Sequence, residues 1–190
     1  MSRYTWILDP GHGEFTPGKR FKEFHEWEFN RAIANRVVAL CPAVDIRITN
    51  PGPVDAGVMK RWQYAKGLQE QNGNCVFLSI HGNAAGKGKT WHPAHGATAF
   101  HHPKDKRGKI LAKWLLEAID AKTDINVDRG VKTSRFSVLA GTMSMPSALL
   151  ECEFFTNEWG YVRMMSPEGR DGIAQSIAYV IHQMEETGEL

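Results

Sequence analysis

Three short apolar segments of this chain each lead into a side chain that can bind a metal or move a proton. The side chains are His12, His81 and Glu151, and they follow residues 4–8, 76–80 and 148–150. Short apolar runs bounded by Gly and Pro are typical of buried strands. Functional groups of open α/β sheets gather beyond the carboxyl ends of such strands. We therefore predict that these groups converge around a catalytic zinc ion, which needs few protein ligands and one open position.

His12 lies in the turn Asp9-Pro10-Gly11-His12-Gly13. The two glycines leave room for a bulky ligand close to the backbone, and the proline stiffens the approach. Asp9 could orient the imidazole as a hydrogen-bond acceptor. A polar turn after a strand would use the same residues, so the turn alone leaves both interpretations open.

His81 ends the apolar run 76–80 and is followed by Gly82-Asn83. A polar ring at the end of a buried strand is costly unless it is paired or coordinated. The alternative is a hydrogen-bonded histidine at the start of a loop. The residue pattern at this position does not decide between the two.

A third zinc ligand must come from another segment. The candidates lie just before or at the start of the first predicted helix and are Glu14, Glu23, His25, Glu26 and Glu28. Glu26 is favoured because Trp27, Phe29 and Ile33 set the buried face and leave it near the helix mouth. It could equally complement the helix dipole there. Spacing alone does not separate Glu26 from Glu28 or His25.

Glu151 ends the run 148–150, where partial burial should raise the pKa of its carboxyl toward the range of a useful general base. Glu153 would share its face if the strand continues. Two carboxylates could form an acid–base pair, as in glycosidases. The alternative is one functional glutamate and one charge at the rim.

The other histidines are given less weight. His92 and His95 fall in a Gly- and Lys-rich loop, and the pair His101-His102 should point to opposite sides; we expect loop or surface positions for all four. Cys41, Cys75 and Cys152 are odd in number and lack the CxxC spacing of zinc knuckles. Cys75 and Cys152 are expected to be small buried hydrophobes.

Bulk properties predict one globular domain covering 1–190. Hydrophobic residues make up 42% of the 190 and charged residues 23%, which is ordinary for a soluble protein. A net charge of +2 without a long basic run argues against nucleic acid as a partner. No segment has the length of a membrane span or a signal peptide. We therefore expect synthesis in the cytoplasm without a signal peptide.

The predicted elements alternate between strands and helices. The strands are expected near 4–8, 44–48, 75–80, 97–101 and 147–151, and the helices near 26–40, 58–71, 110–119 and 170–186. Residues 82–96 are expected to be an irregular insertion, and residues 129–141 a loop with a small hairpin. This order predicts an α/β fold with a central, mainly parallel or mixed sheet flanked by helices on both faces.

With these residues in place, the chain resembles the zinc-dependent N-acetylmuramoyl-L-alanine amidases of the amidase 3 type, found in bacterial autolysins and phage endolysins. Four segments are similar to the motifs of that family and occur in its order over nearly the whole chain. They are LDPGHG at 8–13, EWEFN at 26–30, SIHGNA at 79–84 and PSALLECEFFTN at 146–157. Met59-Lys60-Arg61 is also similar to a family helix that has a recurrent arginine.

The resemblance implies a site and a reaction. His12, Glu26 and His81 would hold one Zn²⁺, Glu151 would be the catalytic base, and Asp9, Arg61, Asn83 and Glu153 would support the site or contact substrate. It implies a peptidoglycan hydrolase that cleaves the linear amide between N-acetylmuramic acid and L-alanine. Peptidoglycan is then the expected partner of a monomer or weak oligomer, which acts on the cell wall after lysin-like release or non-classical export.

The chain departs from the family pattern at two places, and two alternative functions also fit its sequence. Glu153 stands where the family usually has glycine, so we expect an altered cleft floor, and the 82–96 loop follows no pattern that we can interpret. One rival is a zinc peptidase or deacylase that acts on another amide. The other is a non-catalytic wall-binding domain, although complete ligand and base positions argue against it.

Overall fold

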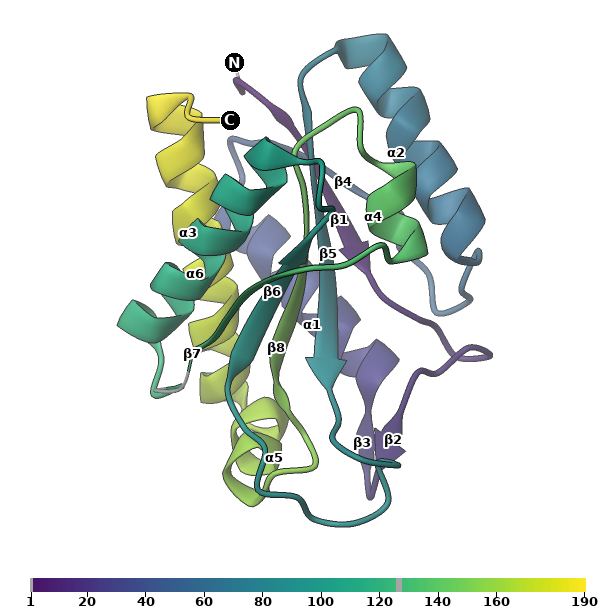
Figure 1. Cartoon of the computed structure of the whole chain (residues 1–190), viewed down its shortest axis with the longest axis vertical. Coiled ribbons are helices and arrows are strands. Elements are labelled where there is room, and N and C mark those ends of the chain that lie inside the picture. The colour runs from purple at the N-terminus through teal and green to yellow at the C-terminus, as the bar shows by residue number, and fades with distance from the viewer. Residues whose placement is uncertain (1, 126–127) are drawn as a thin grey trace.

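The computed structural model describes residues 2–125 and 128–190. Strands and helices alternate along most of the chain, as Figure 1 shows. The strands are β1 (Thr5–Pro10), β2 (Arg20–Phe21), β3 (Phe24–His25), β4 (Asp45–Ile48), β5 (Cys75–Asn83), β6 (Ala97–His101), β7 (Asp128–Thr133) and β8 (Ser147–Phe154). The helices are α1 (Glu26–Leu40), α2 (Val58–Asn72), α3 (Lys106–Lys122), α4 (Ser137–Gly141), α5 (Glu158–Met165) and α6 (Pro167–Thr187).

The described strands form a six-stranded sheet in the order β4-β1-β5-β8-β6-β7, beside a small β2–β3 hairpin. The strands β4, β1, β5 and β8 are parallel, whereas β6 runs antiparallel to β8. The parallel strands therefore end at one edge of the sheet, which places the residues that follow them side by side. The predicted α/β class with a mixed sheet is confirmed.

Successive residues of β1 show how both faces of the sheet are covered. Trp6 and Leu8 enter a large core shared with α1, α3 and α6, while Ile7 enters a smaller core shared with α2 and α4. A strand covered on both sides needs a continuous apolar run, because alternate side chains point to opposite faces. The apolar runs singled out in the sequence are these central strands.

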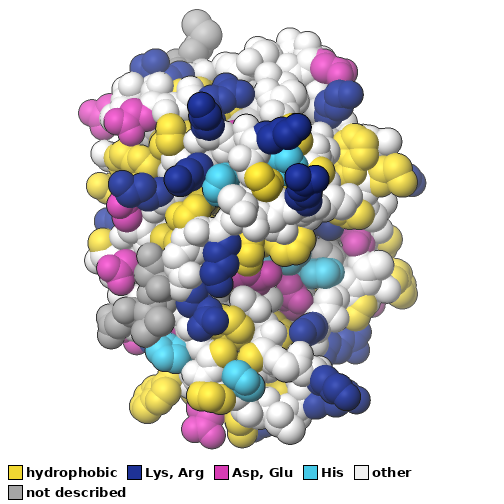
Figure 2. Space-filling view, in the orientation of Figure 1, with side chains coloured by type: hydrophobic (Ala, Val, Ile, Leu, Met, Phe, Trp, Pro, Cys, Tyr) yellow, Lys and Arg dark blue, Asp and Glu magenta, His cyan; other side chains and the backbone are white. Residues whose placement is uncertain are grey.

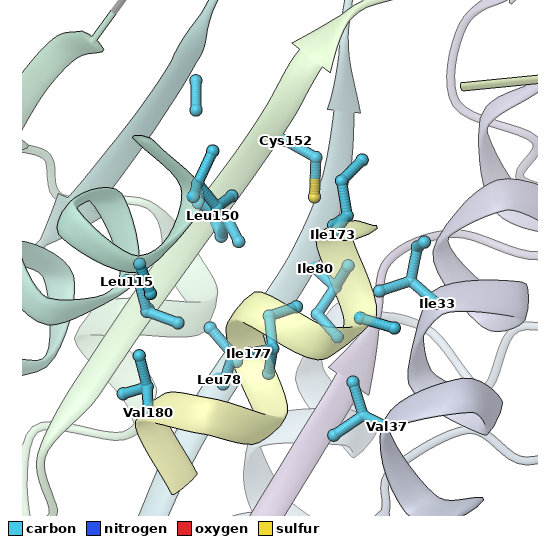
Figure 3. Packing of buried hydrophobic residues seen from close by; sticks show 14 of the residues in the cluster. Ile33, Val37, Leu78, Ile80, Leu115, Leu150, Cys152, Ile173, Ile177 and Val180 are labelled. Atoms are coloured by element: carbon cyan, nitrogen blue, oxygen red, sulfur yellow. The ribbon is translucent and has the colours of Figure 1, made fainter. Parts of the chain in front are cut away.

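The large core joins strands and helices that are distant in the sequence. Figure 3 shows Ile33 and Val37 from α1 packed near Ile177 from α6 and Leu78 from β5. These side chains are fully buried. Cys152 also lies in this core, on the opposite side of β8 from the candidate base, as the alternation of strand residues predicts.

Two segments differ from the prediction. Residues 129–141 were expected to be a loop with a hairpin, but they contain β7, which is parallel to β6, and the short helix α4. The run Arg129-Gly130-Val131-Lys132 is too polar to signal a strand, and it forms one because the edge of the sheet offers backbone partners. The helix expected near 110–119 begins earlier, at Lys106, and Ile110 is exposed on it.

The C-terminal region also has more helix than its periodicity predicts. The helix α5 was not expected, and α6 begins at Pro167 rather than near residue 170. Asn157 and Ser166 accept hydrogen bonds from backbone N–H groups in the first turns of α5 and α6. These capping side chains are the sequence signal for both starts. Within the described residues, no helix has the length and apolarity needed to cross a membrane.

The core predicts a contrast between two isoleucines. Ile177→Ala should lower the free energy of unfolding by about 2–5 kcal/mol, because it removes buried methyl groups and leaves a cavity. Ile110→Ala, at a residue 39% exposed on α3, should change it by roughly 0.5 kcal/mol or less. Urea denaturation of both variants measures the difference. Equal losses would mean that the large core does not depend on α6.

Candidate metal centre

Three potential metal ligands meet at the carboxyl-end edge of the sheet. Glu26 Oε1 lies 3.3 Å from His12 Nε2 and 3.0 Å from His81 Nδ1. One ligand atom from each residue lies within 4.8 Å of the other two. Metal–ligand bonds of 2.0–2.2 Å in a tetrahedral site put neighbouring ligand atoms about 3.3 Å apart. The donor set and its spacing therefore fit a zinc ion with one open position.

Each ligand comes from a different kind of element. His12 lies in the turn after β1 with a left-handed φ of 67°, His81 lies within β5, and Glu26 is the first residue of α1. Two glycines make room for them. A Cβ at Gly11 would lie 2.1 Å from the His81 ring, and one at Gly18 would lie 2.4 Å from Glu26 Oε2. A side chain at either position would displace a ligand.

The buried Glu26 carboxylate is held by several donors. Burial alone would raise its pKa, but hydrogen bonds from the His12 and His81 rings lower the pKa to about 2. The Lys19 amide donates a hydrogen bond of 2.9 Å to Oε2. Burial alone would lower the pKa of His12, and the contact with Glu26 raises it above the ordinary value. Glu26 is therefore ionised and ready to bind a cation.

Asn30 links α1 to the turn that contains His12. It is fully buried, and its side-chain amide donates a hydrogen bond of 2.9 Å to the Gly11 carbonyl. Asn30 is one helical turn beyond Glu26, so one helix both supplies a ligand and fixes the backbone next to another. This contact gives a physical reason for the spacing of the EWEFN segment.

Glu151 faces the same site from the neighbouring strand. It is paired with His81 in the β5–β8 register, and its Oε2 atom is buried with no hydrogen-bond partner among the described residues. Burial, aided by the negative charge of Glu26, raises the pKa of Glu151 well above its ordinary value. A raised pKa makes a carboxyl better suited both to accept a proton and to return it, as general acid–base chemistry requires.

The ligands and Glu151 line one cavity of about 620 Å³. Figure 2 shows acidic and histidine side chains in a hollow on this face, with basic side chains on several sides. Asn83 and Arg61 also line the cavity. The opposite wall includes Phe136 and Val138 around α4. Sequence reasoning missed this wall because α4 was expected to be a loop.

Asp9 has a different partner from the one expected. Its fully buried carboxylate accepts hydrogen bonds of 2.9 and 3.1 Å from Arg61 Nη1, 2.7 Å from Ser79 Oγ and 2.6 Å from Thr49 Oγ1. These bonds join β1, β5, α2 and the end of β4 beneath the turn that contains His12. Asp9 therefore supports the backbone of that turn, whereas Glu26 contacts the His12 ring.

Glu153 does not line the cavity that Glu151 lines. Its side chain is 1% exposed and accepts hydrogen bonds from the backbone N–H groups of Gly96 and Phe154, at 2.5 and 2.8 Å, and from Arg163 Nη1 at 3.0 Å. An irregularity in the β5–β8 register after His81 displaces this part of β8. Glu153 thus fastens the end of the 82–96 loop, and the structure places it away from the expected cleft floor.

The rival ligands lie elsewhere. His25 Nδ1 is 3.0 Å from Glu28 Oε1, and Glu23 accepts a hydrogen bond of 2.7 Å from the Tyr161 hydroxyl. His101 and His102 are both buried. The expectation of a loop or surface position was therefore wrong for His101, which ends β6, whereas His102 lies in the loop between β6 and α3. The His101 ring is used within the fold, because its Nδ1 lies 2.9 and 3.1 Å from two backbone carbonyls.

Comparison with known proteins shows similarity over nearly the whole chain. The family described as "N-acetylmuramoyl-L-alanine amidase" matches residues 7–183. The chain is 29% identical to N-acetylmuramoyl-L-alanine amidase LytC of Bacillus subtilis over 178 residues, which cover 91% of this chain and 34% of LytC. It is also 29% identical to an uncharacterized cell wall amidase of Bacillus anthracis, with the same coverage. The chain thus spans about a third of the length of these curated relatives.

Solved structures share this fold. An N-acetylmuramoyl-L-alanine amidase from Clostridium difficile 630 has a TM-score of 0.85 and 25% identity, with 98% of this chain and 99% of that chain covered. The corresponding values for AmiC2 of Nostoc punctiforme are 0.84, 25%, 96% and 97%. The sheet and helices described above are therefore the fold of these proteins.

The buried Glu153 predicts an asymmetric effect on stability. Glu153→Ala should lower the free energy of unfolding by roughly 3 kcal/mol, because it leaves two backbone N–H groups and a guanidinium without their acceptor. Asp124→Ala removes the exposed partner of the same Arg163 and should cost less than about 1 kcal/mol. Chemical denaturation tests both. Similar losses would show that Glu153 is not the anchor of the loop.

Proposed function

The chain belongs to the N-acetylmuramoyl-L-alanine amidase family, and from this membership we propose that it hydrolyses the amide between N-acetylmuramic acid and L-alanine in peptidoglycan. The observation that supports the proposal is the meeting of two imidazoles, one ionised carboxylate and one carboxyl with a raised pKa in a single cavity. The whole of 1–190 acts as one catalytic domain, and its place of action is the cell wall.

His12, Glu26 and His81 would hold one zinc ion. When bound, the ion acts as a Lewis acid toward the scissile carbonyl and lowers the pKa of water to about 7. The buried position of Glu26 and the glycines at 11 and 18 keep the three ligand atoms converged. An arrangement that is formed before substrate arrives avoids reorganisation during the reaction.

Glu151 is the proposed proton carrier. Its carboxylate accepts a proton from the attacking water and returns it to the nitrogen of the leaving L-alanine. Its Oε2 is buried with no hydrogen-bond partner among the described residues, which disfavours the charged form, and the residue lines the cavity in which substrate and water would meet it. The apolar surroundings that raise its pKa bring it toward the working range of a base that must also act as an acid.

Residues around the proton carrier position the substrate. Arg61 and Asn83 border the cavity, where a guanidinium and a side-chain amide can meet carbonyl or carboxylate groups. Asp9 keeps Arg61 in place through the buried ion pair. A monomer, or a weak oligomer, is sufficient for this chemistry because one chain supplies all the proposed groups.

Replacing the proton carrier should abolish turnover without loss of metal. Glu151→Gln keeps the shape of the side chain but cannot accept a proton, so the hydrolysis rate should fall roughly 10²- to 10⁴-fold. Glu117→Gln, on the exposed surface of α3, should keep the normal rate. The rate is measured by the release of intact stem peptides from purified peptidoglycan, and zinc content by metal analysis. Near-normal turnover of Glu151→Gln would remove Glu151 from the reaction.

Metal dependence separates the proposed ligands from their neighbours. Purified protein should contain one zinc ion per chain, lose activity with a chelator and recover it with added zinc. His81→Ala should lose most of its zinc and activity, since it removes one of three ligands. His25→Ala removes a nearby histidine that pairs with Glu28 and should keep both. Full metal occupancy of His81→Ala would contradict the ligand assignment.

A further inference from the structure

A row of hollows continues from the catalytic cavity along the loop between β5 and β6. The first hollow, of about 470 Å³, is lined by Arg20, Phe21, Lys22, Gly88, Lys89, Thr90 and Trp91. The second, of about 270 Å³, is lined by Trp91, His92, Pro93, Asn157, Glu158 and Trp159. Trp91 is the wall common to both. In Figure 1 this loop runs along one end of the molecule, from the β2–β3 hairpin to α5.

Lys19 connects the first hollow to the catalytic cavity. It lines the cavity, and its ammonium donates a hydrogen bond of 3.3 Å to the Gly86 carbonyl in the loop. The next residue, Arg20, already lines the first hollow. A chain molecule that leaves the cavity past Lys19 would therefore reach Trp91 and then Trp159.

Two tryptophans in these hollows are open to solvent. Trp159 is 79% exposed and Trp91 is 38% exposed. Indole rings are normally largely buried, because they offer more apolar area than most side chains. Exposed aromatic rings that border concave surfaces are typical of recognition sites.

Neighbouring side chains hold the Trp91 ring in place. Trp91 contacts Phe21 and Tyr161 edge-on at centroid distances of 4.6 and 5.6 Å, and the Lys22 ammonium lies 4.2 Å from its ring centroid. Little ordering entropy would therefore be lost at Trp91 when a ligand binds. The backbone of Trp159 is fixed in the first turn of α5, where its amide donates a hydrogen bond of 3.0 Å to Asn157 Oδ1.

The loop itself is fastened on the side away from the β2–β3 hairpin. The His92 amide donates a hydrogen bond of 2.8 Å to the Thr156 carbonyl, and the Ala85 amide donates one of 2.9 Å to Thr156 Oγ1. Asn157 Nδ2 donates to the His92 carbonyl at 3.4 Å. The loop is thus tied to the segment between β8 and α5, which fixes the backbone at Trp91 relative to the start of α5.

We propose that the tryptophan rim, defined as Trp91, Trp159 and the two hollows beside them, binds the glycan strand of a polysaccharide substrate. A pyranose ring has an apolar C–H face that can lie against an indole, and its hydroxyl and acetamido groups need polar partners at the edges. Arg20, Lys89, Asn157 and Glu158 supply donors and acceptors around the two rings. A polymer of repeating sugars fits successive hollows better than a single compact ligand does.

This inference rests on the proposed function, which supplies a glycan polymer as substrate. It adds a second contact region that uses the sugar chain and not the scissile amide. The rim should therefore govern how tightly the polymer binds, while the chemistry in the catalytic cavity is unchanged. The binding of a substrate too short to reach Trp91 should not depend on the tryptophan rim.

The test measures binding of a β-1,4-linked N-acetylglucosamine tetramer by calorimetry, using the full chain with Glu151→Gln to prevent turnover. Adding Trp91→Ala and Trp159→Ala together should weaken binding roughly tenfold or more, which is a loss of about 1.4 kcal/mol or more, because both apolar contacts with the sugar faces are removed. Adding Trp91→Phe and Trp159→Phe should restore part of the affinity. Tyr179→Ala, at an aromatic residue 41% exposed on α6, should leave binding unchanged.

Kinetics in the otherwise unaltered chain supply the second readout. The double alanine variant should raise the KM for glycan polymer roughly tenfold and keep the rate on a short N-acetylmuramoyl peptide. Unchanged tetramer binding in the double variant would overturn the proposal that the tryptophan rim binds glycan. So would a change in self-association, seen by sedimentation velocity, with tetramer binding intact. If no amide is hydrolysed but the tetramer binds and the double variant loses it, the proposed function fails and the rim stands.

Discussion

The contact of one buried carboxylate with two imidazoles is the interaction on which the rest of this structure depends. Glu26 is removed from water at the first turn of α1, and a carboxylate in that position is unstable without donors or a cation. His12, His81 and the Lys19 amide supply the donors. The helix, the turn after β1 and the strand β5 must therefore keep their relative positions for these contacts to form.

The parallel sheet fixes these relative positions, because its neighbouring strands end at one edge. The strands β1, β5 and β8 end side by side, so a turn residue, a strand residue and a second carboxylate face one cavity without any long-range adjustment. The pKa values of the two carboxyl groups in this cavity, those of Glu26 and Glu151, are shifted in opposite directions. Glu26 is ionised by its donors, and the neighbouring Glu151, buried without hydrogen-bond partners at Oε2 among the described residues, has a raised pKa. Their different surroundings explain why Glu26 is the proposed metal ligand and Glu151 the proposed proton carrier.

Two buried ion pairs stabilise the frame around this site. Asp9 and Arg61 lie beneath the turn that contains His12, and Glu153 and Arg163 fasten the far end of the loop between β5 and β6. Buried pairs contribute little net stability compared with apolar packing, but removing one partner is costly. Their role is to fix positions. The first pair supports the turn that contains His12, and the second fastens the end of the loop at Gly96.

The amino-acid sequence by itself determined the central strands, because strands covered on both faces require unbroken apolar runs. It also determined His12, His81 and Glu151 as residues at the ends of those runs, and the motif order identified the family. Only the tertiary structure showed that Asp9 pairs with Arg61 and that Glu153 binds the Gly96 amide and Arg163. Partners that are distant in the chain leave no local sequence pattern. The polar segment of β7 and the short α4 were likewise decided by the sheet edge and by packing on α2, which lie far from them in sequence.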